Sequence, residues 1–209
     1  KLKSLTLRGT NISLLQGLKP KFISNLDSLD LSENSFQDLS TFNWSSLENL
    51  NSLSLSNLNI SDLSFLSKFP NSTMIKYLNL SFNSIRSLEN MVMIQIRNPR
   101  ILDLSNNKIE YIADEVFNNR LSIWDLYLNN NKLRVFPNLN VQSFKINLSN
   151  NLIRRIDTLL IEKLIILTIL DLSRNQIESI EFENIFDTDS SLLELYLYKN
   201  QLTEINSIV

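Results

Sequence analysis

The stretch LTILDLSRNQI at residues 167–177 contains the pattern that decides the fold. Leu170 and Leu172 are separated by Asp171 and followed by polar residues, so this segment is expected to form a short strand with one buried face. Asn175 follows where such a strand must turn, and Ile177 brings the chain back to an apolar position. The stretch therefore predicts one strand and one tight turn within eleven residues.

The same pattern recurs nine times along the chain, with starts at residues 2, 26, 50, 75, 99, 123, 143, 167 and 192. The starts are 24 or 25 residues apart, except for 20 between the sixth and seventh repeats. With the first residue of each repeat called position one, positions one, four, six and eleven are apolar at 34 of 36 sites, and only Pro99 and Ser143 depart. A chain that is 43% apolar would not give this by chance. The regularity predicts a solenoid in which each repeat buries its apolar face against its neighbours.

Position nine is asparagine in seven of the nine repeats. These residues are Asn34, Asn83, Asn107, Asn131, Asn151, Asn175 and Asn200. Thr10 and Leu58 stand at this position in the other two repeats. Because a buried amide needs hydrogen-bond partners, we expect a stacked row of asparagines that satisfies backbone groups of the turn and of the adjacent repeat.

The pattern resembles that of the leucine-rich repeat family, over the whole chain. The 24-residue length and an apolar residue at position fourteen of all nine repeats resemble the typical subtype of extracellular animal receptors. Toll-like receptor ectodomains and secreted insect immune proteins resemble this array. The resemblance implies an α/β solenoid, a curved array with a concave parallel β-sheet and mostly irregular or short-helical convex segments.

The return segments are predicted to differ from one another. Residues 113–118 and 181–186 look irregular or briefly helical, whereas 135–142 must be short and extended because the seventh repeat starts early. Residues 1–209 are predicted to form one array of nine repeats. Since the pattern begins at once and ends within a return segment, we expect a fragment of a longer ectodomain that lacks its caps.

Positions three, five, seven and eight are expected to face the concave surface. The first three repeats carry mainly small polar groups there, and larger groups begin at Tyr77. Tyrosine and arginine are favoured at interface hot spots. The predicted binding residues are Tyr77, Phe82, Asp103, Asp125, Tyr127, Asp171, Arg174, Tyr196 and Tyr198. The alternative for the aspartates is that they are ordinary solvated strand residues, and binding through the lateral or convex surface also stays open.

Charge and composition exclude several kinds of site. The concave columns hold Arg8, Lys145, Arg174 and Lys199 against six carboxylates, which is no basic stripe, so no nucleic acid is expected. With no His, no Cys and no phosphate-loop or zinc motif, we predict no enzyme, no cofactor and no metal. The longest apolar run, 159–170, includes Glu162 and Lys163 and is too short to span a bilayer, so no membrane contact is expected within this stretch.

Six Asn-X-Ser/Thr sequons occur, at Asn11, Asn43, Asn59, Asn71, Asn79 and Asn147, which is about the number that chance gives in a chain so rich in Asn, Ser and Thr, so their count is nearly neutral evidence. Four of them are candidate glycosylation sites on turns or return segments: Asn11, Asn43, Asn59 and Asn71. The resemblance implies a secreted protein or a receptor ectodomain in innate immunity, binding a protein ligand or co-receptor without catalysis. The resemblance also allows a homodimer or heterodimer. The alternatives are a cell-adhesion protein, or a cytoplasmic or bacterial leucine-rich repeat scaffold.

Overall fold

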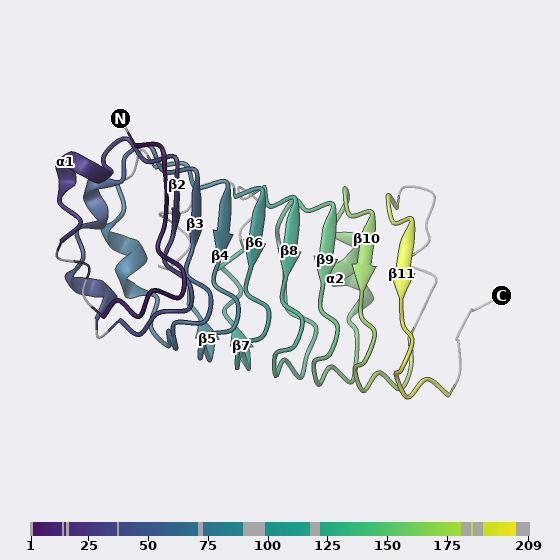
Figure 1. Ribbon diagram of the computed structural model, residues 1–209. Helices are drawn as coiled ribbons and strands as arrows, with labels where there is room; N and C mark the ends of the chain where they lie inside the picture. Colours follow the sequence, from purple (N-terminus) through teal and green to yellow (C-terminus); the bar gives the residue numbers. More distant parts are fainter. Residues whose placement is uncertain are drawn as a thin grey trace.

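The fold was analysed in a computed structural model that describes residues 2–13, 15, 17–36, 38–70, 73–89, 99–117, 122–180, 185 and 190–203. Each repeat contributes one three-residue strand to a parallel sheet, and the strands lie side by side in chain order (Figure 1). The nine strands are β1 (Ser4–Thr6), β2 (Ser28–Asp30), β3 (Ser52–Ser54), β4 (Tyr77–Asn79), β6 (Ile101–Asp103), β8 (Asp125–Tyr127), β9 (Lys145–Asn147), β10 (Ile169–Asp171) and β11 (Glu194–Tyr196). The predicted parallel-sheet solenoid is confirmed.

The register of the sheet follows the repeat alignment position by position. Leu102 of β6 pairs with Leu126 of β8, which in turn pairs with Ile146 of β9. The latter pairing keeps its register although those two repeats start only 20 residues apart. Because a slip of one residue would turn the apolar side chains outward, burial of position four fixes the register throughout.

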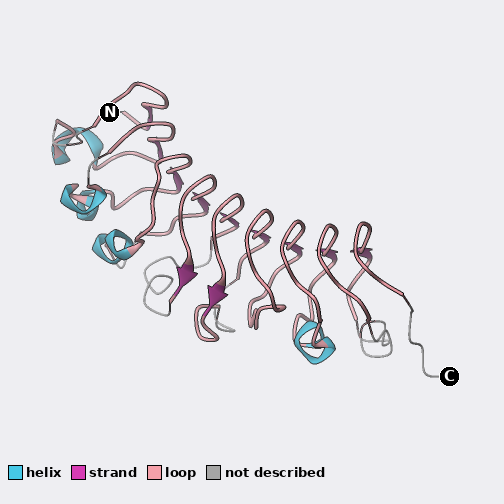
Figure 2. Cartoon of the chain, turned by 90° about the horizontal axis from the view of Figure 1, so that it is seen from below, coloured by secondary structure: helices cyan, strands magenta, loops and turns pink. Residues whose placement is uncertain are grey.

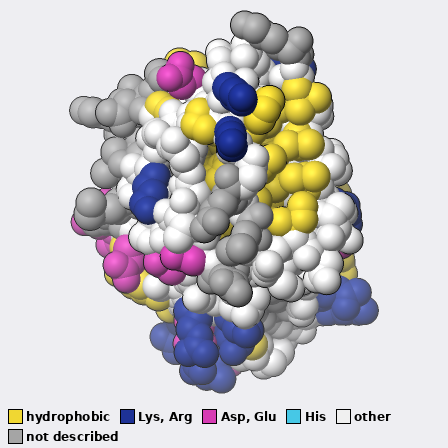
Figure 3. Space-filling view, turned by 60° about the vertical axis from the view of Figure 1, so that its left-hand side comes forward, with side chains coloured by type: hydrophobic (Ala, Val, Ile, Leu, Met, Phe, Trp, Pro, Cys, Tyr) yellow, Lys and Arg dark blue, Asp and Glu magenta, His cyan; other side chains and the backbone are white. Residues whose placement is uncertain are grey.

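The core lies directly behind the sheet. In the interior repeats the leucines of positions four and six are almost completely buried, as Leu102 and Leu104 are at 0% exposure. In the first repeat Leu5 and Leu7 are only partly buried, since they have a neighbour on one side. Figure 3, which views the molecule from its N-terminal side, shows a hydrophobic patch there. Stability therefore rests on contacts between successive repeats, as in other solenoids.

The return segments are short and varied. They include the helices α1 (Pro20–Ile23) and α2 (Thr158–Glu162), the 3₁₀ helices η1 (Leu39–Thr41), η2 (Trp44–Ser46) and η3 (Ser64–Lys68), and a small sheet of β5 (Ser87–Leu88) with β7 (Tyr111–Ile112). Residues 135–142 contain no helix and no strand of either sheet; the N–H of Val141 bonds the Leu139 carbonyl at 2.9 Å, and Gln142 forms an isolated parallel bridge with Ser122.

Two return segments were expected to be irregular or briefly helical: 113–118 is irregular over its described part, and only residue 185 of 181–186 is described. Residues 113–117 form a turn in which the N–H of Val116 bonds the Ala113 carbonyl at 3.0 Å. Val116 and Phe117 are both buried by this turn, so packing onto the core replaces helical hydrogen bonding.

The stack curves, with the main sheet along the inner side of the arc and the helices along the outer side (Figure 2). Strands pack closely at a spacing of roughly 4.8 Å, whereas the bulkier return segments need more room. The sheet is therefore concave.

No helix in the described part of the chain is long and apolar enough to cross a membrane.

Candidate functional site

The asparagines of position nine lie beneath the turn after each strand and join neighbouring repeats. The Nδ2 of Asn131 donates to the carbonyls of Leu128, in its own repeat, and Leu104, in the preceding repeat, both at 3.0 Å. Its Oδ1 accepts from the N–H of Ile109 at 2.9 Å. The same contacts recur at Asn34, Asn83, Asn107, Asn151, Asn175 and Asn200. Each amide thus satisfies backbone groups of two repeats.

Two repeats lack this amide and are stabilised differently. In the first, the hydroxyl of Thr10 donates to a carbonyl of its own turn at 2.7 Å. In the third repeat, position nine is the buried Leu58, whose side chain has no polar group. The side-chain amide that would bond backbone groups of the second repeat is therefore missing. An aromatic cluster joins those two repeats instead: the ring of Trp44 lies 5.2 Å from that of Phe65 and 5.0 Å from that of Phe69. Such aromatic contacts stabilise the fold beyond the contribution from burial of the rings.

Position eight has a left-handed backbone in every repeat, with φ between +53° and +63°. The nine residues are Gly9, Glu33, Asn57, Phe82, Asn106, Asn130, Asn150, Arg174 and Lys199. Glycine, and to a lesser degree asparagine, tolerates this conformation, whereas other L-residues lose about 1–2 kcal/mol. Four asparagines and one glycine among these nine residues are the sequence signal for a positive φ, and sequence reasoning did not use it. Phe82 and Arg174 hold exposed side chains on a strained backbone, a feature that is common at functional sites.

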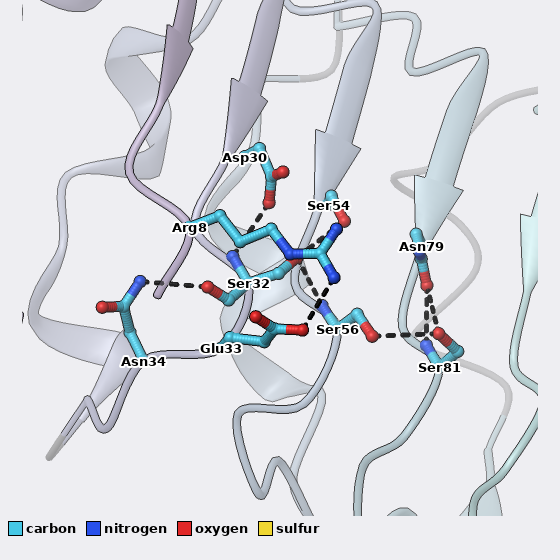
Figure 4. Close-up of polar contacts among 9 residues, drawn as sticks. All are labelled: Arg8, Asp30, Ser32, Glu33, Asn34, Ser54, Ser56, Asn79 and Ser81. Carbon is cyan, nitrogen blue, oxygen red and sulfur yellow. Dashed lines mark hydrogen bonds and ion pairs between the residues drawn. The ribbon is translucent and has the colours of Figure 1, made fainter. Parts of the chain in front are cut away.

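The first three repeats of the concave face carry mainly small polar side chains, which bond one another and the fourth repeat (Figure 4). The hydroxyls of Ser32 and Ser54 are 2.8 Å apart, and Ser56 bonds the next serine along, in β4's repeat, at 3.0 Å. Arg8 and Glu33 form an ion pair at 2.7 Å, which holds the pKa of the Glu33 carboxyl below its ordinary value, chiefly through the hydrogen bond. These groups leave few donors or acceptors for a ligand.

Position seven does not face open solvent as expected. Ser32, Ser81, Ser105 and Ser173 are buried, because the chain already turns inward there before the left-handed residue. Arg8 in the first repeat and Tyr198 in the ninth, the latter at 54% exposure, are exposed. Among the described residues, the Ser173 hydroxyl is the one buried side-chain polar atom that has no hydrogen-bond partner.

The aspartates of position five have a local structural task. The Oδ1 of Asp103 accepts from the N–H of Ser105, and that of Asp171 from the N–H of Ser173, both at 2.9 Å. Such side-chain-to-backbone bonds two residues apart form Asx turns. The contacts favour the alternative that Asp103 and Asp171 belong to the strand ends rather than to a binding site.

The C-terminal half of the concave face carries the larger predicted residues. Arg174 is exposed in the eighth repeat, and Tyr196 and Tyr198 are 42% and 54% exposed in the ninth. The hydroxyl of Tyr196 donates to Glu194 at 2.6 Å, and this bond to a carboxylate raises the pKa of Tyr196. The backbone N–H of Arg174 donates to the Tyr198 carbonyl at 2.9 Å, so the two residues are backbone neighbours in adjacent repeats.

The other predicted residues lie nearer the middle of the sheet. Burial, followed by the charge of Asp125, raises the pKa of the half-buried Tyr127, and the ammonium of Lys145 lies 5.6 Å from the Tyr127 ring centre. Tyr77 and Phe82 belong to the fourth repeat and are exposed by 42% and 58%. The predicted residues therefore fall into three groups, in repeats four, five to six, and eight to nine.

The sequons at Asn11, Asn43 and Asn59 carry exposed side chains. Asn11 and Asn59 take positive φ values of +57° in the turn after position nine. Asn71 lies outside the described residues.

Sequence reasoning missed an exposed row at position two, just before the strands. Trp124 and Phe144 are each 44% exposed, with ring centroids 6.1 Å apart. The guanidinium of Arg100 lies 4.5 Å over the Trp124 ring. Leu193, 82% exposed, continues the row. Aligning the position-two column would have found it, because Arg100, Trp124 and Phe144 occupy successive repeats.

No group of three or more potential metal ligands occurs in the parts of the chain that the structure describes. The surface consists of backbone turns, hydroxyls, tyrosines and a few charges on an open face. Such a surface suits recognition of another molecule.

Comparison with known proteins agrees with this arrangement. The family model described as Leucine Rich Repeat matches residues 167–187. Lumican of Coturnix japonica and lumican of Gallus gallus are each 31% identical over 134 residues, or 63% of this chain. The chain matches only 39% of the length of either lumican.

Solved structures give the same fold over nearly the whole chain. A leucine-rich repeat protein of Leptospira interrogans is 26% identical with a TM-score of 0.78, covering 96% of this chain and 50% of its own. TLR13 in its complex with ssRNA13 gives a TM-score of 0.74 at 22% identity, covering 98% of this chain and 33% of its own. The APL1 leucine-rich repeat domain gives 0.65 at 17%, covering 98% and 58%. The latter two show the fold alone.

Proposed function

Since this chain is a leucine-rich repeat protein, we propose that it is part of an extracellular recognition protein of the immune type and binds a protein ligand through the C-terminal half of its concave sheet. The fold supports a binding role. The assignment of the binding site to the C-terminal half of the sheet rests on one observation, the exposed group of Arg174, Tyr196 and Tyr198 on two adjacent repeats.

The chemistry of that group suits a protein partner. Tyrosine and arginine contribute large contact area and directional hydrogen bonds, and they are enriched at interface hot spots. Tyr196 is held in place by its bond to Glu194, so little side-chain entropy is lost on binding. The first three repeats carry no exposed aromatic side chain on this face, and their serines bond one another and Ser81.

The extracellular setting is supported by the relatives, and three of the sequons are compatible with it. Asn11, Asn43 and Asn59 are exposed and lie away from the tyrosines, so glycans there would leave the proposed interface open. Nucleic acid is not proposed for this face, although TLR13 was solved with ssRNA13, because the concave columns carry four cations against six carboxylates.

A bacterial or cytoplasmic scaffold is the second candidate function. The observation in its favour is the match to the Leptospira interrogans protein, whose TM-score of 0.78 accompanies 26% identity. A cell-adhesion protein would use the same surface with a partner on another cell.

The binding proposal can be tested by affinity capture from the extracellular fluid of the source organism with three immobilised proteins. These are the wild type, the double variant Tyr196→Ala/Tyr198→Ala, and the control Phe22→Ala. Phe22 is 55% exposed but lies on α1, away from the concave sheet. A protein retained by the wild type and control but lost from the double variant would support the proposal.

Both variants should melt like the wild type, since exposed side chains contribute little to stability. Equal capture by all three proteins would move the interface elsewhere. Intact mass before and after enzymatic removal of N-linked glycans tests the setting separately. An unchanged mass from a eukaryotic source would contradict the extracellular assignment and favour the scaffold.

A further inference from the structure

The side of the solenoid where the strands end carries a concentration of positive charge. In repeats four to seven, positions ten to thirteen hold six cations, which we call the basic lateral face: Arg86, Lys108, Lys132, Arg134, Arg154 and Arg155. Glu110 is the one carboxylate at those positions. All seven side chains are exposed, in a chain whose net charge is only −2. Figure 3 shows Lys and Arg side chains gathered along the lower edge, where the strands end in Figure 1.

Little within the protein neutralises this charge. The ion pairs of the described residues include one on this face, between Lys132 and Glu110 at 3.9 Å, and exposed pairs of this kind contribute little. Lys108 donates to the hydroxyl of Ser84 at 3.1 Å, which is a neutral partner. The face therefore attracts an anionic partner.

A hollow of about 330 Å³ lies within the face, lined by Arg134, Leu152, Arg154 and Gln176. The Nε of Arg154 donates to the side-chain oxygen of Gln176 at 3.1 Å, which orients the guanidinium. No other hydrogen bond of either arginine's guanidinium is made within the described part of the chain, so both retain donors for a ligand. Two guanidinium groups beside one hollow suit a carboxylate, which they bind in bidentate fashion.

Apolar side chains beside the cations indicate which kind of anion fits. Tyr111 and Val135 occupy position thirteen of the fifth and sixth repeats and are 60% and 69% exposed. Arginine mixed with aromatic and apolar groups is typical of protein interfaces. Single-stranded nucleic acid would call for several aromatic rings on which bases stack. Tyr111 is the one exposed ring at these positions of repeats four to seven.

The face is confined to one part of the array. Positions ten to thirteen of the first three repeats hold no Lys or Arg, and they include the sequons Asn11 and Asn59. The charge is therefore not a general property of this side of the solenoid.

We propose that the basic lateral face is a second binding surface, which takes an acidic segment of a protein partner, with Arg134 and Arg154 binding one of its carboxylates in the hollow between them. This surface is separate from the concave site, and its test does not depend on the proposed function. The exposed Tyr111 and Val135 of the same face contact apolar side chains of the segment.

Fluorescence anisotropy with a labelled hexaglutamate peptide at low salt tests the proposal. The double variant Arg134→Gln/Arg154→Gln should weaken binding at least about tenfold. The control Lys76→Gln/Lys163→Gln removes the same charge from exposed lysines outside the face and should change binding less than twofold. The variant Arg134→Lys/Arg154→Lys keeps the charge but loses the bidentate geometry, so it should also weaken binding. All variants remain folded because these side chains are exposed.

Three results would overturn the proposal. The first is no binding of hexaglutamate by the wild type, and the second is equal loss in the Arg→Gln and control variants, which would indicate attraction by net charge alone. The third is binding of a heparin fragment or a single-stranded oligonucleotide to this face at lower concentrations than hexaglutamate. That result would replace the acidic protein segment with a different polyanion.

Discussion

Asn131 holds two repeats together through one side chain, and the same is true at the other six positions of the column. This role follows from the sequence because an aligned column of asparagines must be buried and must find partners. The left-handed column one residue earlier does not follow as easily. Glu33, Phe82, Arg174 and Lys199 carry no sign of positive φ individually, and only the alignment with Gly and Asn does.

Replacing Asn131 with alanine should destabilise the chain by about 1–3 kcal/mol, because the N–H of Ile109 loses its acceptor in a buried position. Urea unfolding followed by circular dichroism measures the change. Asn129→Ala is the matched control, since that side chain makes no hydrogen bond among the described residues. A similar small effect for both variants would show that water replaces the amide.

Ser173→Ala should leave stability unchanged or raise it by up to about 1 kcal/mol. Its hydroxyl is buried without a partner, so its removal ends an unfavourable desolvation. Ser81→Ala, which removes a hydroxyl bonded to Asn79 at 2.7 Å, should instead destabilise. Thermal melts of the two variants decide the matter, and a clear loss in Ser173→Ala would point to an ordered water at this hydroxyl.

The strands and the return segments differ in how far they could be predicted. The strands follow the apolar alternation of each repeat and were placed correctly. The return segments depend on packing between repeats: the ring of Trp44 packs against those of Phe65 and Phe69. No local sequence pattern predicts that this cluster joins the two repeats where Leu58 replaces the asparagine. The turn at 113–117 has the same origin, because burial of Val116 and Phe117 outweighs helix propensity.

The start of η3 should depend on pH through Asp62. Its carboxylate accepts from the hydroxyl of Ser64 at 2.6 Å and the N–H of Ser64 at 2.8 Å, which lowers the pKa of Asp62 from its ordinary value of 3.8. A lowered folded-state pKa stabilises the fold above the unfolded value and loses this effect as pH falls through the folded value.

Asp62→Ala should therefore destabilise at pH 7, by less than about 1 kcal/mol because the side chain is exposed, and by still less near pH 2–3. Denaturant curves at the two pH values measure the difference. Asp62→Asn retains an acceptor oxygen without a titrating group, so its effect should not vary over this range. A constant difference for Asp62→Ala would refute the electrostatic cause.

The solenoid architecture could be predicted because the same apolar pattern recurs in nine repeats. The distribution of charged residues between the faces of the solenoid could not. A net charge of −2 averages a basic lateral side with acidic surfaces elsewhere. The basic lateral face and the row of Trp124 and Phe144 lie outside the concave columns, so the composition of those columns predicts neither of them. Three of the predicted binding residues, Arg174, Tyr196 and Tyr198, do lie together, whereas Asp103 and Asp171 serve strand ends.

Stability should vary along the array. The leucines of β6 and β8 are fully buried between two neighbours, whereas Leu5 of β1 and Leu195 of β11 are only partly buried. Hydrogen–deuterium exchange with mass spectrometry should show slower exchange for the two central strands than for the two outer ones. Uniform protection along the chain would mean that the 209 residues unfold as one cooperative unit.

The left-handed position eight also has a consequence for chirality. At φ near +57° an L-residue is in the mirror image of its preferred helical region, so a D-residue is relaxed there. A chain assembled by chemical ligation with D-asparagine at position 106 should fold with its handedness unchanged, although every neighbour is L. The same exchange at Leu104, two residues earlier and fully buried, would direct the side chain away from the core. The solenoid thus contains a regularly spaced set of sites at which the usual preference for one enantiomer is reversed.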